Sequence, residues 1–197
     1  MKILAVSGGS GCGKTLFTKL LVESLSKSAV LPLDSYYKDR PENIPSEKYD
    51  FDIPEAFDFD LYFEHLDRLI SGESVNMPHF GYKTGKRKES FSEIGPEEYL
   101  IIEGLHVLLH SKVREMLSYS FYMEAPLDVA ICRMCLRDIK NYEVTAEYRL
   151  NQYLRFVRPA YFRHILPTKQ YADIVIKNNY DSHLDEFVGD FLLNMKL

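Results

Sequence analysis

Eight residues near the start of the chain have the types and spacing that bind phosphate groups. The pattern G-x-x-x-x-G-K-[ST] is matched by Gly8-Gly9-Ser10-Gly11-Cys12-Gly13-Lys14-Thr15. Glycines let backbone N–H groups turn inward around phosphate oxygens, and a helix that begins there directs its positive end toward them. We expect Lys14 to contact the β- and γ-phosphates of a bound nucleotide and the Thr15 hydroxyl to ligate Mg²⁺.

The segments on both sides of this loop have the patterns that the motif requires. The apolar run 3–6 predicts a short buried strand, and a helical spacing of apolar residues follows at Leu16, Leu20, Leu21 and Leu25. A simple glycine turn between a strand and a helix is the alternative interpretation. A chance match with these flanks is on the order of 1% or less, so the sequence predicts nucleotide binding.

Two carboxylates are predicted where ligands bind in α/β folds, at the carboxyl ends of strands. Asp34 follows the apolar run 30–33 and is a candidate to take a proton from an acceptor hydroxyl, to contact Mg²⁺, or to do both. A turn-forming aspartate is the alternative there. Glu103 ends a buried apolar run, where an unpaired carboxylate would be unfavourable. We therefore expect a metal-associated role for Glu103 rather than a solvated strand end.

Two arginines are spaced to lie on one face of a helix. Arg133 and Arg137 are four residues apart within the helical pattern 127–142. Two guanidinium groups on one face suit a lid that closes on phosphates, and a surface ion pair is the alternative. The same helix carries Cys132 and Cys135, for which packing is favoured over redox or zinc chemistry because a second pair of metal ligands is missing.

Composition limits the remaining possibilities. The chain has 197 residues, 46% of them hydrophobic, and a net charge of −5 from 24 basic and 29 acidic residues. These values predict one domain over residues 1–197 and disfavour binding to nucleic acid or to anionic membranes. Three cysteines make no disulfide framework, no apolar run is long enough to span a bilayer, and the phosphate loop leaves no room for a signal peptide. We expect a cytoplasmic protein.

The order of the elements predicts an α/β fold with a mainly parallel sheet flanked by helices. Besides the first strand and helix, strands are expected at 30–33, 99–104, 120–123 and 174–176, and helices at 61–70, 127–142, 146–165 and 184–195. Segments 75–82 and 88–94 are expected to form a hairpin through the turn 83–86, and 38–60 is expected to be a structured loop. Five aromatic residues near this region either stack on a planar ring or pack in the core: Phe51, Phe57, Phe59, Phe80 and Tyr82.

Taken together in this order, these segments resemble the uridine–cytidine kinase family of P-loop nucleoside kinases, nearly from end to end. Beyond the phosphate loop, the resemblance is carried by Asp34-Ser35-Tyr36-Tyr37, 51–58, Ile102-Glu103-Gly104, Leu136-Arg137-Asp138, Gln152-Tyr153 and 167–174. It implies a P-loop NTPase fold with a small β-hairpin over the acceptor site and a helical lid. It also implies ATP and Mg²⁺ as cofactors and phosphorylation of a nucleoside 5′-hydroxyl.

The resemblance also implies roles for individual residues. Asp34 resembles the general base, Asp52 the carboxylate that binds the ribose hydroxyls, and Glu103 the residue near Mg²⁺. The residues expected to act in catalysis are Lys14, Asp34 and Arg137. Those expected at the metal are Thr15, Asp34 and Glu103. Those expected to contact the acceptor are Phe51, Asp52, Phe80, Tyr82 and Gln152. ATP is expected to bind the whole loop Gly8, Gly9, Ser10, Gly11, Cys12, Gly13, Lys14 and Thr15, together with Arg133.

Several positions depart from the family pattern. The ring-reading tyrosine and histidine positions fall on Phe80 and Gly85, and one of the paired lid arginines is replaced by Met134. The Arg-Gly-Arg lid signature aligns with Tyr142-Glu143-Val144, which removes two positive charges. Hairpin cations that would compensate are Lys83, Lys86, Arg87 and Lys88.

These departures leave three hypotheses. The first is a uridine or cytidine kinase-like enzyme, and the second is a P-loop kinase for another small hydroxyl compound, such as a phosphorylated sugar. The third is a non-catalytic, ATP-binding regulatory relative. The expected partners are ATP and a small-molecule acceptor, without nucleic acid or membrane. The family commonly forms homo-oligomers, but the sequence identifies no interface.

Overall fold

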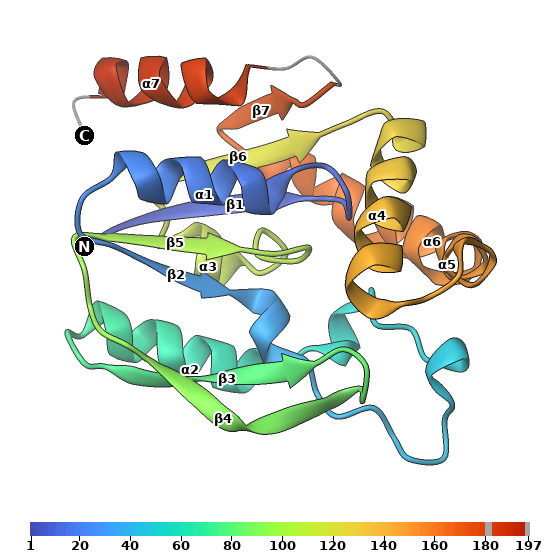
Figure 1. The fold of residues 1–197 in the computed structure, drawn as a ribbon. Helices are drawn as coiled ribbons and strands as arrows, with labels where there is room; N and C mark the ends of the chain where they lie inside the picture. The colour runs from blue at the N-terminus through green and yellow to red at the C-terminus, as the bar shows by residue number, and fades with distance from the viewer. Residues whose placement is uncertain (180–182, 196–197) are drawn as a thin grey trace.

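A parallel β-sheet lies at the centre of the computed structural model, which describes residues 1–179 and 183–195 (Figure 1). Within these residues its strand order is β2-β5-β1-β6-β7. The strands are β1 (Lys2–Gly8), β2 (Ser28–Pro32), β5 (Tyr99–Glu103), β6 (Tyr119–Glu124) and β7 (Ile174–Lys177). The inner strands are nearly continuous apolar runs because helices cover both faces of the sheet. The predicted α/β fold is confirmed.

Alternate residues of β1 face opposite sides of the sheet. Leu4 and Val6 pack with the helices α1 (Lys14–Ser24) and α7 (Leu184–Met195). Ile3 and Ala5 pack on the other side with α2 (Phe59–Ile70). Figure 1 shows α1 in front of the sheet, α7 beyond β7 at one edge and α2 beyond β2 at the other.

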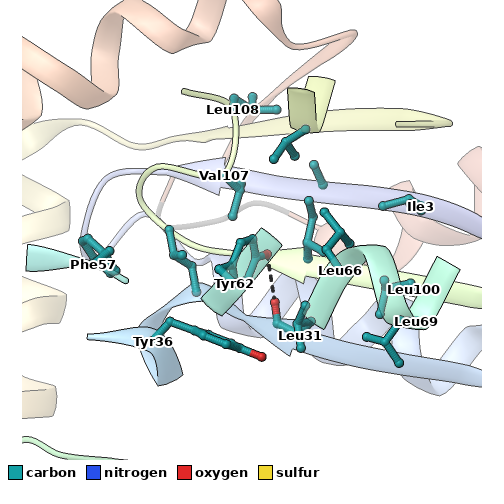
Figure 2. Close-up of a cluster of buried hydrophobic side chains, with 14 of the residues drawn as sticks. Ile3, Leu31, Tyr36, Phe57, Tyr62, Leu66, Leu69, Leu100, Val107 and Leu108 are labelled. Atoms are coloured by element: carbon teal, nitrogen blue, oxygen red, sulfur yellow. Dashed lines mark hydrogen bonds between the residues drawn. The ribbon is translucent and has the colours of Figure 1, made fainter. Parts of the chain in front are cut away.

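The core under α2 is closed by aromatic and aliphatic side chains (Figure 2). Tyr62 is fully buried there, and its hydroxyl donates a hydrogen bond to the Leu31 carbonyl oxygen at 3.4 Å. One residue of the predicted α1 pattern lies outside the core: Leu16 is 53% exposed, and Phe17 is buried in its place. The helix turns position 17 toward β6, where Phe17 meets Phe121 with ring centroids 5.1 Å apart.

The strand expected at 30–33 begins earlier and ends at Pro32. Leu33–Tyr36 forms a 3₁₀ turn, so Asp34 lies in the first turn of this segment and not directly at a strand end. The segment 38–60 contains further 3₁₀ turns at Ser46–Lys48 and Pro54–Ala56. The hairpin pairs β3 (Val75–Gly81) with β4 (Lys86–Ile94), which starts two residues before the expected position.

The lid region gathers beside the carboxyl ends of the strands (Figure 1). It contains α4 (Leu127–Tyr142), α5 (Ala146–Gln152) and α6 (Arg158–Ala160). The helix expected over 146–165 is helical throughout, but wide π-type turns interrupt it at Tyr153–Val157 and Tyr161–Ile165. Pro159 lacks the N–H group that a regular α-helix needs at that position. A further short helix, α3 (Ser111–Arg114), follows β5 and has no counterpart in the sequence prediction.

Two other expectations concern cysteines and membranes. Cys132 is exposed and Cys135 half-buried, so the expected packing role is wrong for Cys132, which lies on the outer side of α4. Across the described parts of the chain, no helix combines the length and apolar composition needed to cross a membrane.

Candidate active site

The phosphate loop connects β1 directly to α1. Gly8, Gly11 and Gly13 have positive φ angles of 138°, 78° and 95°, which favour glycine. A Cβ atom at Gly8 would collide with the Met123 carbonyl group, so the loop also needs glycine for its close approach to β6. The Lys14 ammonium donates to the Gly9 carbonyl oxygen at 3.0 Å and therefore lies across the loop.

Cys12 has a structural role within this loop. Its side chain is 2% exposed and belongs to the core cluster under α1. Its carbonyl oxygen accepts a hydrogen bond from Asn178 Nδ2 at 2.9 Å, which ties the loop to the segment after β7. Any contact of Cys12 with a nucleotide would therefore come from its backbone.

Thr15 and Glu103 come together although 88 residues separate them. Glu103 ends β5, which pairs with β1 so that Val6 lies opposite Glu103. The Thr15 hydroxyl donates to Glu103 Oε1 at 2.6 Å. A hydroxyl and a carboxylate oxygen are donor types that Mg²⁺ prefers, so this pair fits the expected metal site.

Asp34 is a buried carboxylate beside the phosphate loop. Burial raises the pKa of Asp34, the nearby Lys14 charge lowers it, and the nearby Glu103 carboxylate raises it. The Tyr82 hydroxyl donates a hydrogen bond to Asp34, which also lowers this pKa. Among the described residues, Asp34 Oδ1 has no hydrogen-bond partner. Buried polar atoms are rarely left in this state, so this oxygen is free to accept a hydrogen bond from a ligand.

Two cavities meet at the phosphate loop. One of about 680 Å³ lies against Gly11, Arg133 and the start of α7. The other, of about 480 Å³, contains Asp34 and lies between the hairpin, the loop 46–52 and the lid helices. The linings of both cavities include Lys14, Thr15 and Arg137. We call the first the donor cavity and the second the acceptor cavity, after the roles that the sequence predicts for their lining residues.

The expected aromatic residues divide into two groups. Phe51, Phe80 and Tyr82 line the acceptor cavity, and the Phe51 and Phe80 ring centroids are 6.1 Å apart. Phe57 is 1% exposed within the core, and Phe59 packs against Phe63 with centroids 5.7 Å apart. Only the first group is placed to stack on a planar ring.

Asp52 and Gln152 also line the acceptor cavity. Burial and the neighbouring Asp50 carboxylate raise the pKa of Asp52 to about 7, against the opposing charge of Arg149. His106 Nε2 hydrogen-bonds to the Asp52 carbonyl oxygen at 2.8 Å and fixes the backbone there. The Gln152 amide donates to the Glu47 carbonyl oxygen at 3.0 Å, which holds the loop 46–52 against α5.

The two lid arginines face different cavities. Arg133 donates to the carbonyl oxygens of Asn178 at 3.1 Å and Asn179 at 2.9 Å, beside the donor cavity. Arg137 lines both cavities, and its Nε lies 2.7 Å from Asp138 Oδ1. The ion pair is therefore present, and the role of Arg137 in a lid that closes on phosphates stays a prediction. The sequence analysis gave no role to the buried Asp138 or to its second partner, Arg149. Arg149 lies three residues before Gln152, on the same face of α5.

The departures from the family pattern have structural counterparts. Gly85 has a φ of 67° and ends the hairpin turn. The Arg40 side chain packs beside it, and the backbone N–H of Arg40 donates to the Gly85 carbonyl oxygen at 2.8 Å. Met134 is buried and lines the acceptor cavity. Three of the four hairpin cations pair with acidic residues: Lys83 with Glu143 at 2.8 Å, Lys86 with Glu42 at 2.7 Å and Arg87 with Asp58 at 2.9 Å. These three do not supply the free positive charge expected of them.

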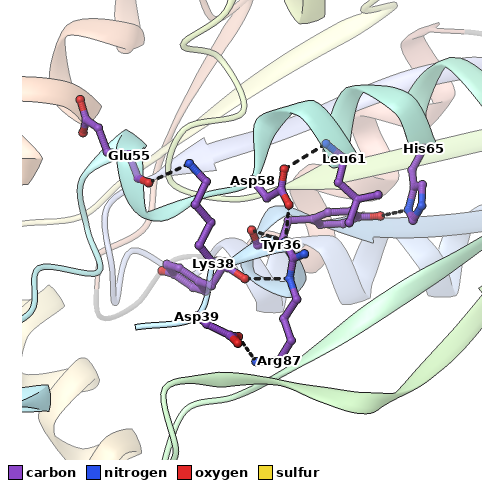
Figure 3. Close-up of polar contacts among 9 residues, drawn as sticks. Tyr36, Lys38, Asp39, Glu55, Asp58, Leu61, His65 and Arg87 are labelled. Atoms are coloured by element: carbon purple, nitrogen blue, oxygen red, sulfur yellow. Dashed lines mark hydrogen bonds and ion pairs between the residues drawn. The ribbon is translucent and has the colours of Figure 1, made fainter. Parts of the chain in front are cut away.

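Arg87 connects the hairpin to residues 37–39 and to Asp58 (Figure 3). Its Nε donates to the Tyr37 carbonyl oxygen at 3.0 Å, and its backbone N–H donates to Asp39 Oδ1 at 2.7 Å. The partner of its guanidinium, Asp58, also caps α2 by accepting the Leu61 N–H at 3.1 Å. One carboxylate therefore connects the hairpin to the start of α2.

We expect Asp58→Ala to destabilise the protein by about 2–3 kcal/mol, because it removes both a helix cap and a half-buried ion pair. Asp58→Asn keeps a capping side chain and should lose roughly 1 kcal/mol less. Urea denaturation of both variants measures the difference. An equal loss of unfolding free energy in Asp58→Ala and Asp58→Asn would show that the helix cap does not contribute to stability.

A phosphate loop, a hydroxyl–carboxylate pair and a buried carboxylate between two cavities define a P-loop kinase. Residues 3–184 match the family model described as "Phosphoribulokinase / Uridine kinase family". This chain belongs to that family. The resemblance found in the sequence is confirmed.

Curated relatives agree with this assignment. The uridine kinase of Borrelia duttonii is 34% identical over 181 residues, which are 89% of this chain and 86% of the relative. The uridine kinase of Anoxybacillus flavithermus is 36% identical over 187 residues, which are 92% and 88% of the two chains.

Solved structures share the fold. Phosphoribulokinase from Rhodobacter spheroides has a TM-score of 0.64 at 15% identity, over 93% of this chain and 72% of that one. D-glycerate 3-kinase from Cryptococcus neoformans has a TM-score of 0.60 at 15% identity, over 81% and 77%. At these identities the likeness concerns the fold alone.

Proposed function

We propose that this chain is an ATP-dependent nucleoside kinase that phosphorylates a 5′-hydroxyl, with uridine or cytidine as the acceptor. The observation that carries the proposal is the unpartnered Oδ1 atom of the buried Asp34, a residue that lines the acceptor cavity together with Lys14 and Thr15 of the phosphate loop. The uridine kinase relatives support the choice of acceptor.

Each residue near this junction has a role in the proposal. Asp34 accepts the proton of the attacking hydroxyl, and Lys14 and Arg137 stabilise the negative charge of the transferring phosphoryl group. Thr15 and Glu103 would hold Mg²⁺, with Asp34 as a third oxygen donor. When bound, this ion neutralises charge on the phosphate oxygens. The hairpin and the lid exclude water from the transfer.

The acceptor cavity favours a neutral acceptor over a phosphorylated sugar. Its carboxylates Asp34 and Asp52 would repel an anion. Of the cations that line it, Lys83 pairs with Glu143 and Arg149 pairs with Asp138. Lys14 and Arg137 also line the donor cavity, where they would contact ATP. The aromatic side chains that line this cavity, Phe51, Phe80 and Tyr82, suit a flat base.

The test is ATP consumption with Mg²⁺ and a panel of ribonucleosides and sugar phosphates, each repeated with Asp34→Asn. We expect uridine or cytidine to stimulate turnover and Asp34→Asn to remove that stimulation. Stimulation by a sugar phosphate alone would replace nucleosides as the acceptor class. ATP binding without stimulation by any acceptor would favour a regulatory protein.

A smaller effect is expected at Tyr82. Since its hydrogen bond lowers the pKa of Asp34, Tyr82→Phe should raise that pKa. The base must be deprotonated, so the acid limb of the kcat/KM profile should move to higher pH, with a loss of roughly 3- to 10-fold at neutral pH. An unchanged acid limb would mean that Tyr82 does not influence the base.

The proposal extends to organisation and location. We place residues 1–197 in one kinase domain in the cytoplasm, acting on small molecules without nucleic acid or membrane. The net charge of −5 supports the absence of nucleic-acid binding, because extended nucleic-acid binding needs basic surfaces. Sedimentation of the purified chain would decide whether it forms a homo-oligomer.

A further inference from the structure

A second guanidinium group reaches the acceptor cavity from α5. Arg149 lines this cavity, and its side chain is 23% exposed. Its Nη2 atom lies 2.5 Å from Asp138 Oδ2, and the Asp138 side chain is fully buried. The other carboxylate oxygen of Asp138 binds Arg137 Nε at 2.7 Å. One buried carboxylate therefore holds two guanidinium groups at the cavity, one from α4 and one from α5.

The environment of Arg149 shows where in the cavity its charge acts. Its positive charge lowers the pKa of Asp52, against the effects of burial and of Asp50. Burial raises the pKa of Tyr142 at the end of α4, and the charges of Arg137 and Arg149 oppose this rise. Among the described residues, Arg149 Nε is buried and has no hydrogen-bond partner. Arg149 and Asp52 therefore line the same cavity and are close enough for their charges to interact, and the Arg149 guanidinium keeps one donor without a protein partner.

A carboxylate and a guanidinium together suit a particular chemical group. A carboxylate only accepts hydrogen bonds and a guanidinium only donates them, whereas a hydroxyl group does both. A vicinal diol can donate to Asp52 and accept from Arg149 at the same time. A deoxy sugar would leave part of this cavity without partners, and a site built on hydrogen bonds discriminates strongly against such an analogue.

We propose that Arg149 binds the acceptor by donating to a hydroxyl oxygen of its sugar diol, and that Asp138 is the positioning residue that holds Arg149 there. This inference rests on the proposed function and adds to it the residue that donates to the sugar diol, Arg149 on α5.

The experiment measures kcat and KM of the full chain with uridine, 2′-deoxyuridine and 3′-deoxyuridine. We expect Arg149→Met to raise the KM for uridine by about 10- to 100-fold, with a smaller change in kcat. The same variant should raise the KM for at least one deoxy analogue by less than about threefold, because the lost hydrogen bond is already missing there. Arg149→Lys should restore part of the affinity for uridine.

Two further variants separate binding from structure. Arg155→Met is the matched control, because Arg155 is exposed on the same helical segment, lies outside the cavity lining and has its guanidinium over the Phe156 ring, 4.9 Å from the ring centroid. It should leave all three KM values unchanged. Asp138→Asn should raise the KM for uridine, and Arg149→Met should have a smaller additional effect in that background.

Equal KM increases for uridine and both deoxy analogues in Arg149→Met would overturn the inference, since a structural defect affects all acceptors alike. Calorimetry measures nucleoside binding in the presence of a non-hydrolysable ATP analogue. It distinguishes a wrong role for Arg149 from a wrong assignment of the kinase function. Uridine binding that Arg149→Met weakens, without turnover, would overturn the kinase function and support the role of Arg149. No binding of any nucleoside would overturn both.

Discussion

Lys14→Ala is expected to reduce kcat by at least about 1,000-fold and to weaken ATP binding by about 10-fold or more. Lys14 lies across the phosphate loop and lines both cavities, so its charge is placed to act on the phosphoryl group during transfer. A fixed charge next to developing negative charge has a large effect in a site that excludes water. Removing Lys14 affects both binding and transfer because the nucleotide phosphates carry charge in both states.

The ATP affinity of Lys14→Ala measures the effect on binding, and its single-turnover rate measures the effect on phosphoryl transfer. Lys19→Ala is the matched control: Lys19 also lies in α1 but is exposed and pairs with Glu23 at 3.5 Å. It should behave as the unmodified chain, because exposed ion pairs contribute little. A Lys14→Ala variant that retained more than a tenth of the turnover rate would contradict the assignment of the phosphate loop.

Asp34→Asn is expected to lower kcat by about 100- to 10,000-fold and to leave ATP affinity within about twofold. The amide keeps the shape of the carboxylate but cannot take the proton from the acceptor hydroxyl. Burial already raises the pKa of Asp34, so replacing this charge should not lower the thermal stability. Loss of activity with intact folding and ATP binding is therefore the expected signature.

Asp60→Asn is the control for this variant, since Asp60 is exposed in the first turn of α2 and lies outside both cavities. Steady-state kinetics and calorimetric ATP titration of both variants measure the difference. Turnover by Asp34→Asn at a rate close to that of the unmodified chain would exclude Asp34 as the general base, and the free Oδ1 atom would then need another explanation.

The contrast between these two variants also separates the hypotheses. A regulatory protein that only binds ATP would lose affinity in Lys14→Ala and would show no acceptor-dependent turnover for Asp34→Asn to remove. A kinase would lose turnover in both variants but ATP affinity in only one. The pair is therefore informative before the preferred acceptor is known.

Local sequence determined the phosphate loop, because its glycine conformations and the start of α1 depend on consecutive residues. It also indicated Thr15 and Glu103 as metal-site residues, although their contact at 2.6 Å depends on the pairing of β1 with β5. The place of Asp34 after an apolar run already made it a candidate base, whereas only the resemblance to the kinase family provided Asp52. The order of strands and helices was enough for the fold class, since parallel strands need crossover helices.

Tertiary packing decided which side chains meet across the acceptor cavity. Phe51 and Phe57 looked alike in the sequence, but only Phe51 lines the cavity, because the turn Pro54–Ala56 directs Phe57 into the core. The pairing of Lys83 with Glu143 connects the hairpin to the lid across 60 residues. Neither outcome follows from spacing, because both depend on how separate segments approach each other.

The same reason explains Arg149. Its position three residues before Gln152 was visible in the sequence, but its buried partner Asp138 belongs to a different helix, and nothing in the sequence indicated that the two side chains pair. The sequence by itself therefore determined the class of chemistry and the loop that binds phosphate. Only the tertiary structure decided which charges are paired and which donors and acceptors are left for a substrate, because burial and partner choice are set by long-range packing.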